Sequence, residues 1–548
     1  MDFHLTVDCL TPSGTALWQG PGSNGFITDA VQMHWPDLQV PLHHAGWQPL
    51  WWLHRPISGL HCTPEGVFAQ PAPDLTAADL DGRALPLWYK AAVPAEGMYT
   101  GTVTLCGTGG EALVFVGRRR LAWRGTLAAG TVQQVPFTVD TVPLISEGDS
   151  APYLNLAVDV SLVGAGLQRL ELQTAPAHTR RVFLMGDSTV TDQSAAVPYA
   201  PGTSYAGWGE MLPWFLPDGF CVSNHAHSGL TTESFTAEGH WALLEQRLRP
   251  GDLVLMQFGH NDQKRPHLDA RGGYTQRLRE YLTAVRAKGA VPLLVTPLAR
   301  NSWTPEGLYN DLLADYAEAM QHLGQQTHTP VIDLHKFTMD QIVRAGREAS
   351  KRWFYSGDYT HTNDFGAFAA AAFVAGALSP ALAVPTLERV PWSPAGPCTP
   401  LAPPPGLPSP EGDPYAAFDH DGPLTRGDTV QLVTAALHLF PVNGYCSPFA
   451  DVVGETPLGI AVQCAVQCGL LPDSWACDGC LHPAAPVTLD EFLAVLLPGY
   501  ATRCPLPDGP DLMARARSAG LLPEGPFPTP DTPLRRDQAV AICRRVHI

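Results

Sequence analysis

The stretch Arg180–Val190, RRVFLMGDSTV, determines how the rest of the chain is interpreted. Its apolar run Val182–Met185 is too short for a helix and lies between charged residues and Gly186, which is typical of a buried parallel strand. Such a strand places Ser188 at its carboxyl end, where open α/β sheets bind their ligands. A serine in this position often only caps a helix. The blocks further along the chain decide whether Ser188 is a helix cap or a candidate nucleophile.

Three further blocks follow in order. Asn224–Gly229 (NHAHSG) and Gln257–Asp262 (QFGHND) each come after a short apolar run, and Asp358–His361 (DYTH) lies near the end of the same α/β region. A nucleophilic serine needs a base and a group that orients the base. The three-residue gap between Asp358 and His361 lets a turn fold the carboxylate beneath the imidazole ring. Ser188 has no Gly-x-Ser-x-Gly context, which argues against an α/β-hydrolase fold.

Together, the four blocks resemble those of the SGNH (GDSL-type) hydrolases. The residues within the blocks look most like those of the rhamnogalacturonan acetylesterase branch. The resemblance covers about residues 180–380 and implies a three-layer α/β/α, flavodoxin-like catalytic domain. It implies no cofactor and no metal. It also implies a catalytic triad, which consists of Ser188, Asp358 and His361. The oxyanion hole that it implies is formed by the Ser188 N–H, the Gly229 N–H and the Asn261 side-chain amide.

The candidate substrate contacts are His260, Arg300 and Trp208. His260 is adjacent to Asn261 and is expected to brace it. The arginine that often follows the second-block glycine in rhamnogalacturonan acetylesterases is replaced here by Leu230, which leaves the exact pectic substrate open. Arg300 follows a later strand and either substitutes for that arginine or pairs with a surface carboxylate.

Length and composition indicate a globular protein of several domains. The chain has 548 residues, of which 45% are hydrophobic and 16% charged, so two to four domains are expected. The formal net charge of −18 argues against nucleic acid or an anionic membrane as partner. No apolar run approaches the ~20 residues of a membrane helix, so no membrane insertion is expected. Met1–Asp8 shows no secretory signal, which predicts a cytoplasmic protein as written, or an extracellular or cell-surface one if a signal was removed.

Residues 1–178 are predicted to form an accessory β-sandwich or jelly roll. Apolar residues alternate with polar ones in 98–105, 132–139, 154–160 and 167–172, with Gly and Pro turns between them. Such a segment resembles the accessory β-domain of bacterial pectin-directed acetylesterases. Trp47, Trp51 and Trp52 are candidates for stacking on sugars or for filling the β-core. The run 118–120, three arginines, either meets a galacturonate carboxylate or forms a solvated turn.

Residues 179–382 alternate apolar strands with amphipathic helices, which predicts the catalytic α/β domain. One helix face runs through Leu278 and Val285 and ends at Gly289. A second starts at Leu308, and Asp364 is expected to cap the last helix. Prolines dominate residues 383–412, so this stretch is predicted to be a semi-rigid linker.

Residues 413–548 contain three similar openings of helical patterns, Leu424–Asp428, Val487–Glu491 and Leu534–Gln538. They resemble degenerate S-layer homology repeats, which implies a small helical trimer and a cell-wall glycan as a further partner. The repeat's usual Thr-Arg pair survives only at 425–426. Cysteine spacing allows a zinc site or buried free thiols, formed by Cys464, Cys468, Cys477 and Cys480.

The sequence therefore predicts a carbohydrate esterase that removes O-acetyl groups from pectic polysaccharide or oligosaccharide by a Ser-His-Asp acyl-enzyme mechanism. Two alternatives stay open. One is an acetylesterase for another glycan such as xylan, and the other is a non-catalytic glycan-binding or scaffold protein.

Overall fold

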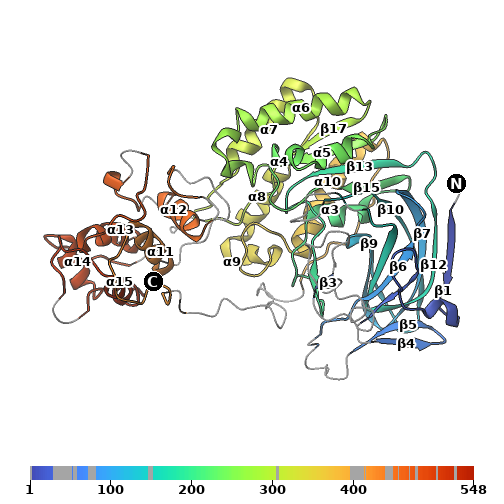
Figure 1. The fold of residues 1–548 in the computed structure, drawn as a ribbon, viewed down its shortest axis with the longest axis horizontal. Coiled ribbons are helices and arrows are strands. Elements are labelled where there is room, and N and C mark those ends of the chain that lie inside the picture. The colour runs from blue at the N-terminus through green and yellow to red at the C-terminus, as the bar shows by residue number, and fades with distance from the viewer. Residues whose placement is uncertain are drawn as a thin grey trace. The chain divides into compact units, whose positions relative to one another are not determined.

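The structure of the protein is a computed structural model that describes residues 3–28, 52–53, 59–71, 80, 82–145, 152, 154–303, 308–394, 413, 415–437, 449–453, 456–467, 470–475, 479–501, 504–523 and 527–547. The chain divides into two compact units. The first consists of Met1–Gly259, Ala270–Ala299 and Leu313–Leu407, and the second of His260–Asp269, Arg300–Leu312 and Pro408–Ile548. All sheets formed by the described residues belong to the first unit (Figure 1).

Two antiparallel sheets form before the catalytic region. The first has the order β10-β7-β12-β5-β4, with β1 also paired to β12, and its strands are β1 (His4–Asp8), β4 (Gly59–Thr63), β5 (Gly66–Gln70), β7 (Gly97–Gly107), β10 (Val132–Thr141) and β12 (Ala165–Thr174). The second has the order β2-β6-β11-β8-β9, and its strands are β2 (Gly25–Ile27), β6 (Leu87–Ala92), β8 (Gly110–Val116), β9 (Arg120–Leu127) and β11 (Ala157–Val163). A short parallel pair joins β3 (Trp52–Leu53) to β14 (Ala195–Ala196).

Side chains from both antiparallel sheets fill one core. Val103 and Leu170 from the first sheet lie in the same buried cluster as Tyr89 and Val160 from the second. The strands that alternation predicted at β7, β10 and β12 are confirmed. Strand β11 begins at Ala157, later than predicted, and is buried along its whole length. As the central strand of its sheet, it lacks the solvent-facing side on which a period of two depends.

The third sheet is parallel and carries the catalytic region. Its order is β15-β13-β16-β17-β18, and its strands are β13 (Arg180–Gly186), β15 (Phe220–Asn224), β16 (Leu253–Gln257), β17 (Val291–Val295) and β18 (Val331–Ile332). This is the flavodoxin-like order. Phe183 and Met185 pack in one buried cluster with side chains from four helices, namely α4 (Ser234–Ala237), α5 (His240–Glu245), α6 (Gly273–Ala287) and α7 (Ala314–Thr327). These helices are labelled in Figure 1. Leu184 faces the opposite layer, which contains α3 (Trp208–Met211), α8 (Leu334–Ala345) and α10 (Asp364–Leu382). Shorter elements are η1 (Pro12–Thr15), η3 (Leu212–Phe215), α9 (Arg347–Ser350) and η6 (Lys351–Trp353).

Helix ends follow the sequence signals only in part. Helix α6 ends at Ala287, and Gly289 has a positive φ of 73°, as its place after a helix predicts. Helix α7 begins at Ala314, so the prediction that this helix starts at Leu308 is wrong. The cap of α10 is Asn363, whose side chain accepts hydrogen bonds from the N–H groups of Phe365 and Gly366 in the first turn of the helix. The predicted cap, Asp364, is buried inside the first turn and serves another purpose.

Helix α10 has the length and apolar composition of a membrane span. This corrects the expectation that no segment approaches that length. Its side chains Phe368, Val374 and Leu378 are buried, and the helix contacts α3 and α8. Within the first unit, α10 is therefore a core helix.

The turn between β8 and β9 leads three arginines into the protein interior. Arg118, Arg119 and Arg120 are only 8%, 1% and 3% exposed. The prediction of a solvated turn is therefore wrong. Strand β9 contacts α3 and η3 of the catalytic region. This turn is therefore one of the places where the two antiparallel sheets, together called the β-domain, meet the catalytic region.

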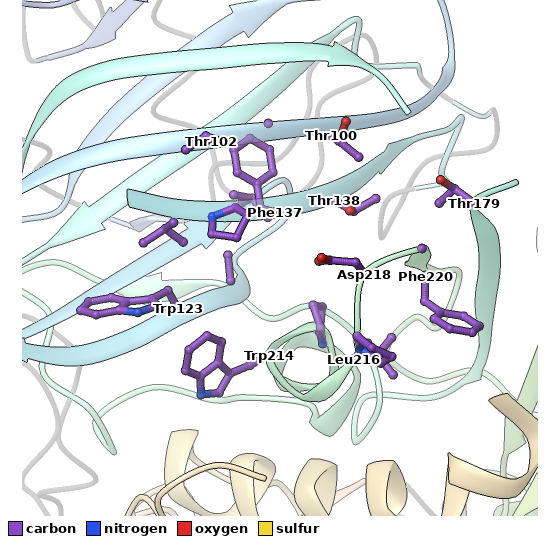
Figure 2. Close-up of a pocket in the computed structure, with 18 of the residues that line it drawn as sticks. Thr100, Thr102, Trp123, Phe137, Thr138, Thr179, Trp214, Leu216, Asp218 and Phe220 are labelled. Carbon is purple, nitrogen blue, oxygen red and sulfur yellow. The ribbon is translucent and has the colours of Figure 1, made fainter. Parts of the chain in front are cut away.

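A cavity of about 730 Å³ lies along β10, the edge strand of its sheet, and extends to η3. Figure 2 shows Phe137 of β10 with Trp123 of β9 and Trp214 of η3 around it. Ser188 and His361 do not line this cavity. It is therefore separate from the residues predicted to be catalytic.

The second unit contains two short 3-10 turns, η4 (Asp262–Lys264) and η5 (Pro266–Leu268), and a set of helices. The helices are α11 (Arg426–Ala436), α12 (Pro457–Gln467), η7 (Asp473–Trp475), α13 (Leu489–Ala501), α14 (Leu512–Ser518) and α15 (Arg536–Cys543). Buried side chains from 424 to 546 form one apolar cluster, with Trp475 and Phe492 among its largest members. This cluster is separate from the cores of the first unit.

Three backbone hydrogen bonds close a ring in the second unit. The N–H of Leu424 donates to the carbonyl of Leu534, the N–H of Leu534 to that of Val487, and the N–H of Val487 to that of Leu424. Each residue comes just before one of the helices α11, α13 and α15. The next residue in each case has its backbone N–H bound by a side chain three positions on, which is Asp428, Glu491 or Gln538. The three predicted openings thus have the same local structure.

Several predictions fall outside the described residues. They concern Trp47 and Trp51, the side chain of Trp52, and the linker beyond residue 394. Cys468, Cys477 and the side chain of Cys464 also lie outside. The zinc hypothesis and both interpretations of these tryptophans, sugar stacking and filling of the β-core, therefore stay predictions.

Candidate active site

Ser188 lies in a tight turn at the carboxyl end of β13. The Asp187 carboxylate accepts hydrogen bonds from the N–H and the hydroxyl of Thr189, at 2.9 and 2.8 Å. The Asp187 carbonyl accepts from the N–H groups of Val190 and Thr191. The chain therefore turns after the serine and does not continue as a helix, so Ser188 is not a helix cap. This turn holds the partly exposed serine hydroxyl at the edge of the sheet.

His361 and Asp358 meet Ser188 from the loop between η6 and α10. The Ser188 Oγ lies 2.8 Å from His361 Nε2, and His361 Nδ1 lies 2.8 Å from Asp358 Oδ2. The acidic partner fixes the ring tautomer, because Nδ1–H donates to the carboxylate and leaves Nε2 free to accept the serine proton. The predicted turn is also present, since Asp358 Oδ1 accepts from the N–H groups of Thr360 and His361 at 2.7 and 2.9 Å.

The surroundings of Asp358 keep it ionised. Burial on its own raises the pKa of this carboxyl group. The neighbouring His361 ring and the backbone N–H groups of His361 and Thr360 outweigh burial and hold the pKa of Asp358 below its usual value. A carboxylate that stays charged stabilises the imidazolium formed when His361 takes a proton.

Two backbone donors of the predicted oxyanion hole belong to the first unit. In the described part of the chain, the N–H groups of Ser188 and Gly229 donate to no protein acceptor. Gly229 has a positive φ of 81°, and a Cβ there would meet no atom within 4 Å. Backbone conformation, not lack of room, is therefore the reason for glycine at this position.

The residues before Gly229 hold its loop in place. The Asn224 side chain donates to the Val190 carbonyl and to Asp192 at 3.0 and 2.8 Å, and it accepts from the Ala226 N–H at 3.1 Å. The second sequence block is thereby tied to the turn that carries the nucleophile.

Asn261, His260 and Arg300 all belong to the second unit. Asn261 comes directly before η4, and the Arg300 Nη2 donates to the His260 carbonyl at 3.2 Å. All three side chains are buried. The role of Asn261 as an oxyanion donor and the substrate contacts of His260 and Arg300 stay predictions.

Trp208 is placed differently from its prediction as a substrate contact. It is 1% exposed, and its indole N–H donates to the Gln257 side chain at 2.8 Å. A ring covered on both faces offers no surface to a sugar, so Trp208 is a core residue that joins α3 to the end of β16.

Sequence reasoning missed three residues next to the triad. Tyr205 is 36% exposed, its ring stacks on Tyr355 at 3.9 Å, and it meets the His361 ring edge-on at 5.6 Å. The Gln193 side chain donates to the Ser188 carbonyl at 2.7 Å. Tyr205 and Gln193 lie in irregular loops without periodicity, so no sequence pattern pointed to them. Only Tyr355 had a signal, since it lies close to the block that contains His361.

A hydrogen-bonded serine, histidine and aspartate at the carboxyl edge of a flavodoxin-like parallel sheet define a serine ester hydrolase. Over residues 184–367, the chain matches the GDSL-like Lipase/Acylhydrolase family. It is 35% identical over 209 residues to the rhamnogalacturonan acetylesterase RhgT of Bacillus subtilis strain 168, covering 36% of this chain and 88% of that protein. The protein belongs to the GDSL-like lipase/acylhydrolase family and is a serine carboxylic-ester hydrolase.

Other known proteins are similar over different lengths. The probable rhamnogalacturonan acetylesterase YesY of the same bacterium is 31% identical over 217 residues, covering 38% of this chain and 96% of that protein. The crystal structure of the Bacillus subtilis YxiM protein aligns with a TM-score of 0.36 at 20% identity, covering 69% of this chain and 98% of that one.

Proposed function

We propose that this enzyme removes O-acetyl groups from pectic polysaccharide or oligosaccharide. The observation that carries the proposal is the hydrogen-bonded chain from Ser188 through His361 to Asp358. It occurs in a protein related to two esterases named for rhamnogalacturonan. The same chain of hydrogen bonds counts against a non-catalytic scaffold.

The reaction runs in two steps. Ser188 Oγ attacks the acetyl carbonyl carbon while its proton passes to His361 Nε2. The carbonyl oxygen becomes an oxyanion, which the N–H groups of Ser188 and Gly229 and the predicted Asn261 amide stabilise. The bond to the sugar oxygen then breaks, and that oxygen takes the proton from His361. In the second step, water gives a proton to His361 and attacks the carbonyl carbon of the acetyl-serine. The bond from that carbon to Ser188 Oγ then breaks, Oγ takes the proton from His361, and acetate leaves.

Tyr205 and Tyr355 supply an aromatic wall for the sugar. The Tyr205 ring is partly exposed and meets the catalytic imidazole edge-on. The C–H groups of a pyranose form an apolar surface on one side of the sugar, and this surface packs against the face of an aromatic ring. The stacked Tyr355 holds the wall in one orientation.

The domain boundaries are also part of the proposal. The common core of the two antiparallel sheets supports an accessory β-sandwich over 1–178. The separate cluster and the hydrogen-bonded ring support a helical repeat module of the S-layer homology type over 413–548. A cell-wall glycan is its proposed partner.

Acetate release from defined polysaccharides tests the function. We expect acetylated rhamnogalacturonan to be deacetylated faster than acetylated xylan at equal acetyl content, with a Ser188→Ala variant as the blank. Faster release from xylan would assign the enzyme to that glycan. Equal release by the wild-type enzyme and the Ser188→Ala variant would contradict catalysis by this triad.

A further inference from the structure

Arg119, in the turn between β8 and β9, is held at the centre of a buried cluster. Its φ is 57° and its side chain has no exposed surface. Its Nε donates to the Gln193 carbonyl at 3.0 Å, and its Nη2 donates to the Tyr205 carbonyl at 2.6 Å and to Glu210 at 2.8 Å. Its Nη1 donates to Asp364 at 3.3 Å. One guanidinium group from the β-domain therefore joins three segments of the catalytic region.

The first of these segments leads to the nucleophile. Gln193 donates its backbone N–H to Glu210 at 3.1 Å and its side-chain amide to the Ser188 carbonyl at 2.7 Å. Arg119 binds both the carbonyl of Gln193 and the carboxylate of Glu210. The turn that carries Ser188 is thus supported, through one residue, by the arginine.

The other two segments lead to the base. Asp364 is three residues beyond His361, and it also accepts from the Tyr199 hydroxyl and the Gly202 N–H at 2.6 and 2.8 Å. Tyr205, whose carbonyl Arg119 binds, pairs by an antiparallel bridge with Asn363, and its ring meets the His361 ring. The loop with the catalytic histidine is therefore fixed from both sides by groups that Arg119 holds.

Charge makes this arrangement depend on arginine. Glu210 and Asp364 are fully buried, and the guanidinium group lies between their carboxylates. Only a planar group with several N–H donors binds two carboxylates and two carbonyls at once. Lysine would keep the charge but lose this geometry.

We propose that Arg119 is a positioning residue for ester hydrolysis, which sets the distance between Ser188 and His361 from within the β-domain. The part of the chain that matches the GDSL-like family, residues 184–367, does not include it. The β-domain is then a structural part of the active site as well as an accessory. The proposal rests on Ser188 and His361 acting as nucleophile and base, and not on which glycan is the substrate.

Arg119→Met tests the proposal against a matched control, Arg181→Met. Arg181 also forms a buried pair between the β-domain and the parallel sheet, with Asp140 of β10 at 2.9 and 3.1 Å. It lies at the amino end of β13, away from Ser188. Each variant loses one buried arginine, so both are expected to lower the melting temperature. Only Arg119→Met is expected to disturb the triad.

Three measurements separate the two roles: kcat and KM for 4-nitrophenyl acetate, and the rate at which a fluorophosphonate labels Ser188. For Arg119→Met, we expect kcat and labelling to fall on the order of 10²-fold, the loss typical of a misplacement of about 1 Å, with KM little changed. For Arg181→Met, both rates should stay near those of the wild type in the folded fraction. Similar rates for the two folded variants would overturn the proposal.

Arg119→Lys covers the case in which Arg119→Met does not fold. It keeps the buried charge, so it should fold, label slowly and keep a wild-type KM. Wild-type labelling of folded Arg119→Lys would contradict a positioning role. Ser188→Ala is labelled in parallel, because labelling that persists in that variant would instead show that the nucleophile is assigned wrongly.

Discussion

Ser188 is the residue on which the reaction depends most directly. Its hydroxyl is hydrogen-bonded to His361 and lies in a turn that other residues hold. We expect Ser188→Ala to lower kcat for 4-nitrophenyl acetate on the order of 10⁶-fold, as in other serine hydrolases. The melting temperature should hardly change, because the hydroxyl supports no other group of the turn. Wild-type turnover by the folded variant would contradict the triad.

Asn261 carries a prediction about the transition state. A carbonyl oxygen gains its charge only as the tetrahedral intermediate forms, so an amide aimed at it acts on kcat more than on binding. Asn261→Ala should lower kcat by about 10²–10³-fold with KM little changed. If Asn261 only supports its loop, the variant will melt earlier and keep its kcat in the folded fraction.

Residue identity was predictable where chemistry leaves a short motif. Ser188, Asp358 and His361 were named from ordered blocks, and the structure brings these three together. The buried Trp208 and the buried arginines at 118–120 were misplaced, since nothing in a single sequence shows that a distant segment covers them. Tyr205 was missed because a loop residue has no periodicity to mark it.

At the scale of elements, helix α5 carries a test by pH. The first residue of this helix is His240. Burial, which has the largest effect, and the charges of His227 and Arg118 together lower the pKa of its side chain from 6.5 to about 3, so His240 stays neutral. The unfolded chain binds this proton near pH 6.5 and the folded one does not. The free energy of unfolding therefore falls as the pH drops from about 6.5 toward 3, by at most about 1.4 kcal/mol per pH unit for this group.

Melting curves of the wild type and of His240→Gln measure this contribution. The variant should lose less stability on acidification, because its side chain does not titrate. Carboxylates titrate in both proteins, so the difference between the two curves isolates His240. Parallel curves would show that the folded protein protonates His240 as readily as the unfolded chain does, which contradicts the lowered pKa.

Strand and helix predictions succeeded where one face meets solvent. Strands β7, β10 and β12 and the end of α6 followed their periodicity and their glycine signal. Strand β11 is buried along its whole length and helix α10 along most of its length, so burial weakens the contrast that marks their faces. The cap of α10 was assigned one residue too late, since Asn363 and Asp364 are both good caps and only the fold gives Asp364 to Arg119.

For the whole molecule, two truncations should give opposite results. Among the described residues, the buried core of the C-terminal helices is made of side chains from 424 onward, with Tyr415 and Phe418 packed against it. Removing the chain after Pro403 should therefore leave a soluble esterase with wild-type activity on 4-nitrophenyl acetate. A loss of activity would show that the loops His260–Asp269 and Arg300–Leu312, which belong to the same compact unit, depend on those helices.

Removing residues 1–178 should abolish activity. The truncated chain lacks Arg119, so Glu210 and Asp364 lose the guanidinium group between them. Their carboxylates then repel each other beside the triad. Circular dichroism and fluorophosphonate labelling distinguish a folded but inactive protein from an unfolded one. A truncated enzyme that labels at the wild-type rate would contradict the dependence on the β-domain.

The ring formed by Leu424, Val487 and Leu534 has a consequence for biosynthesis. The N–H of Leu424 has its acceptor, the Leu534 carbonyl, near the end of the chain. A ribosome that has not passed Leu534 therefore holds an open ring, with a donor at Leu424 and an acceptor at Val487 both unsatisfied. Because domains fold as they emerge, N-terminal first, the esterase can mature while the helical unit waits. A premature stop before Leu534 would then release a folded esterase whose C-terminal helices lack the third member of the ring, and these helices would not fold as a partial module.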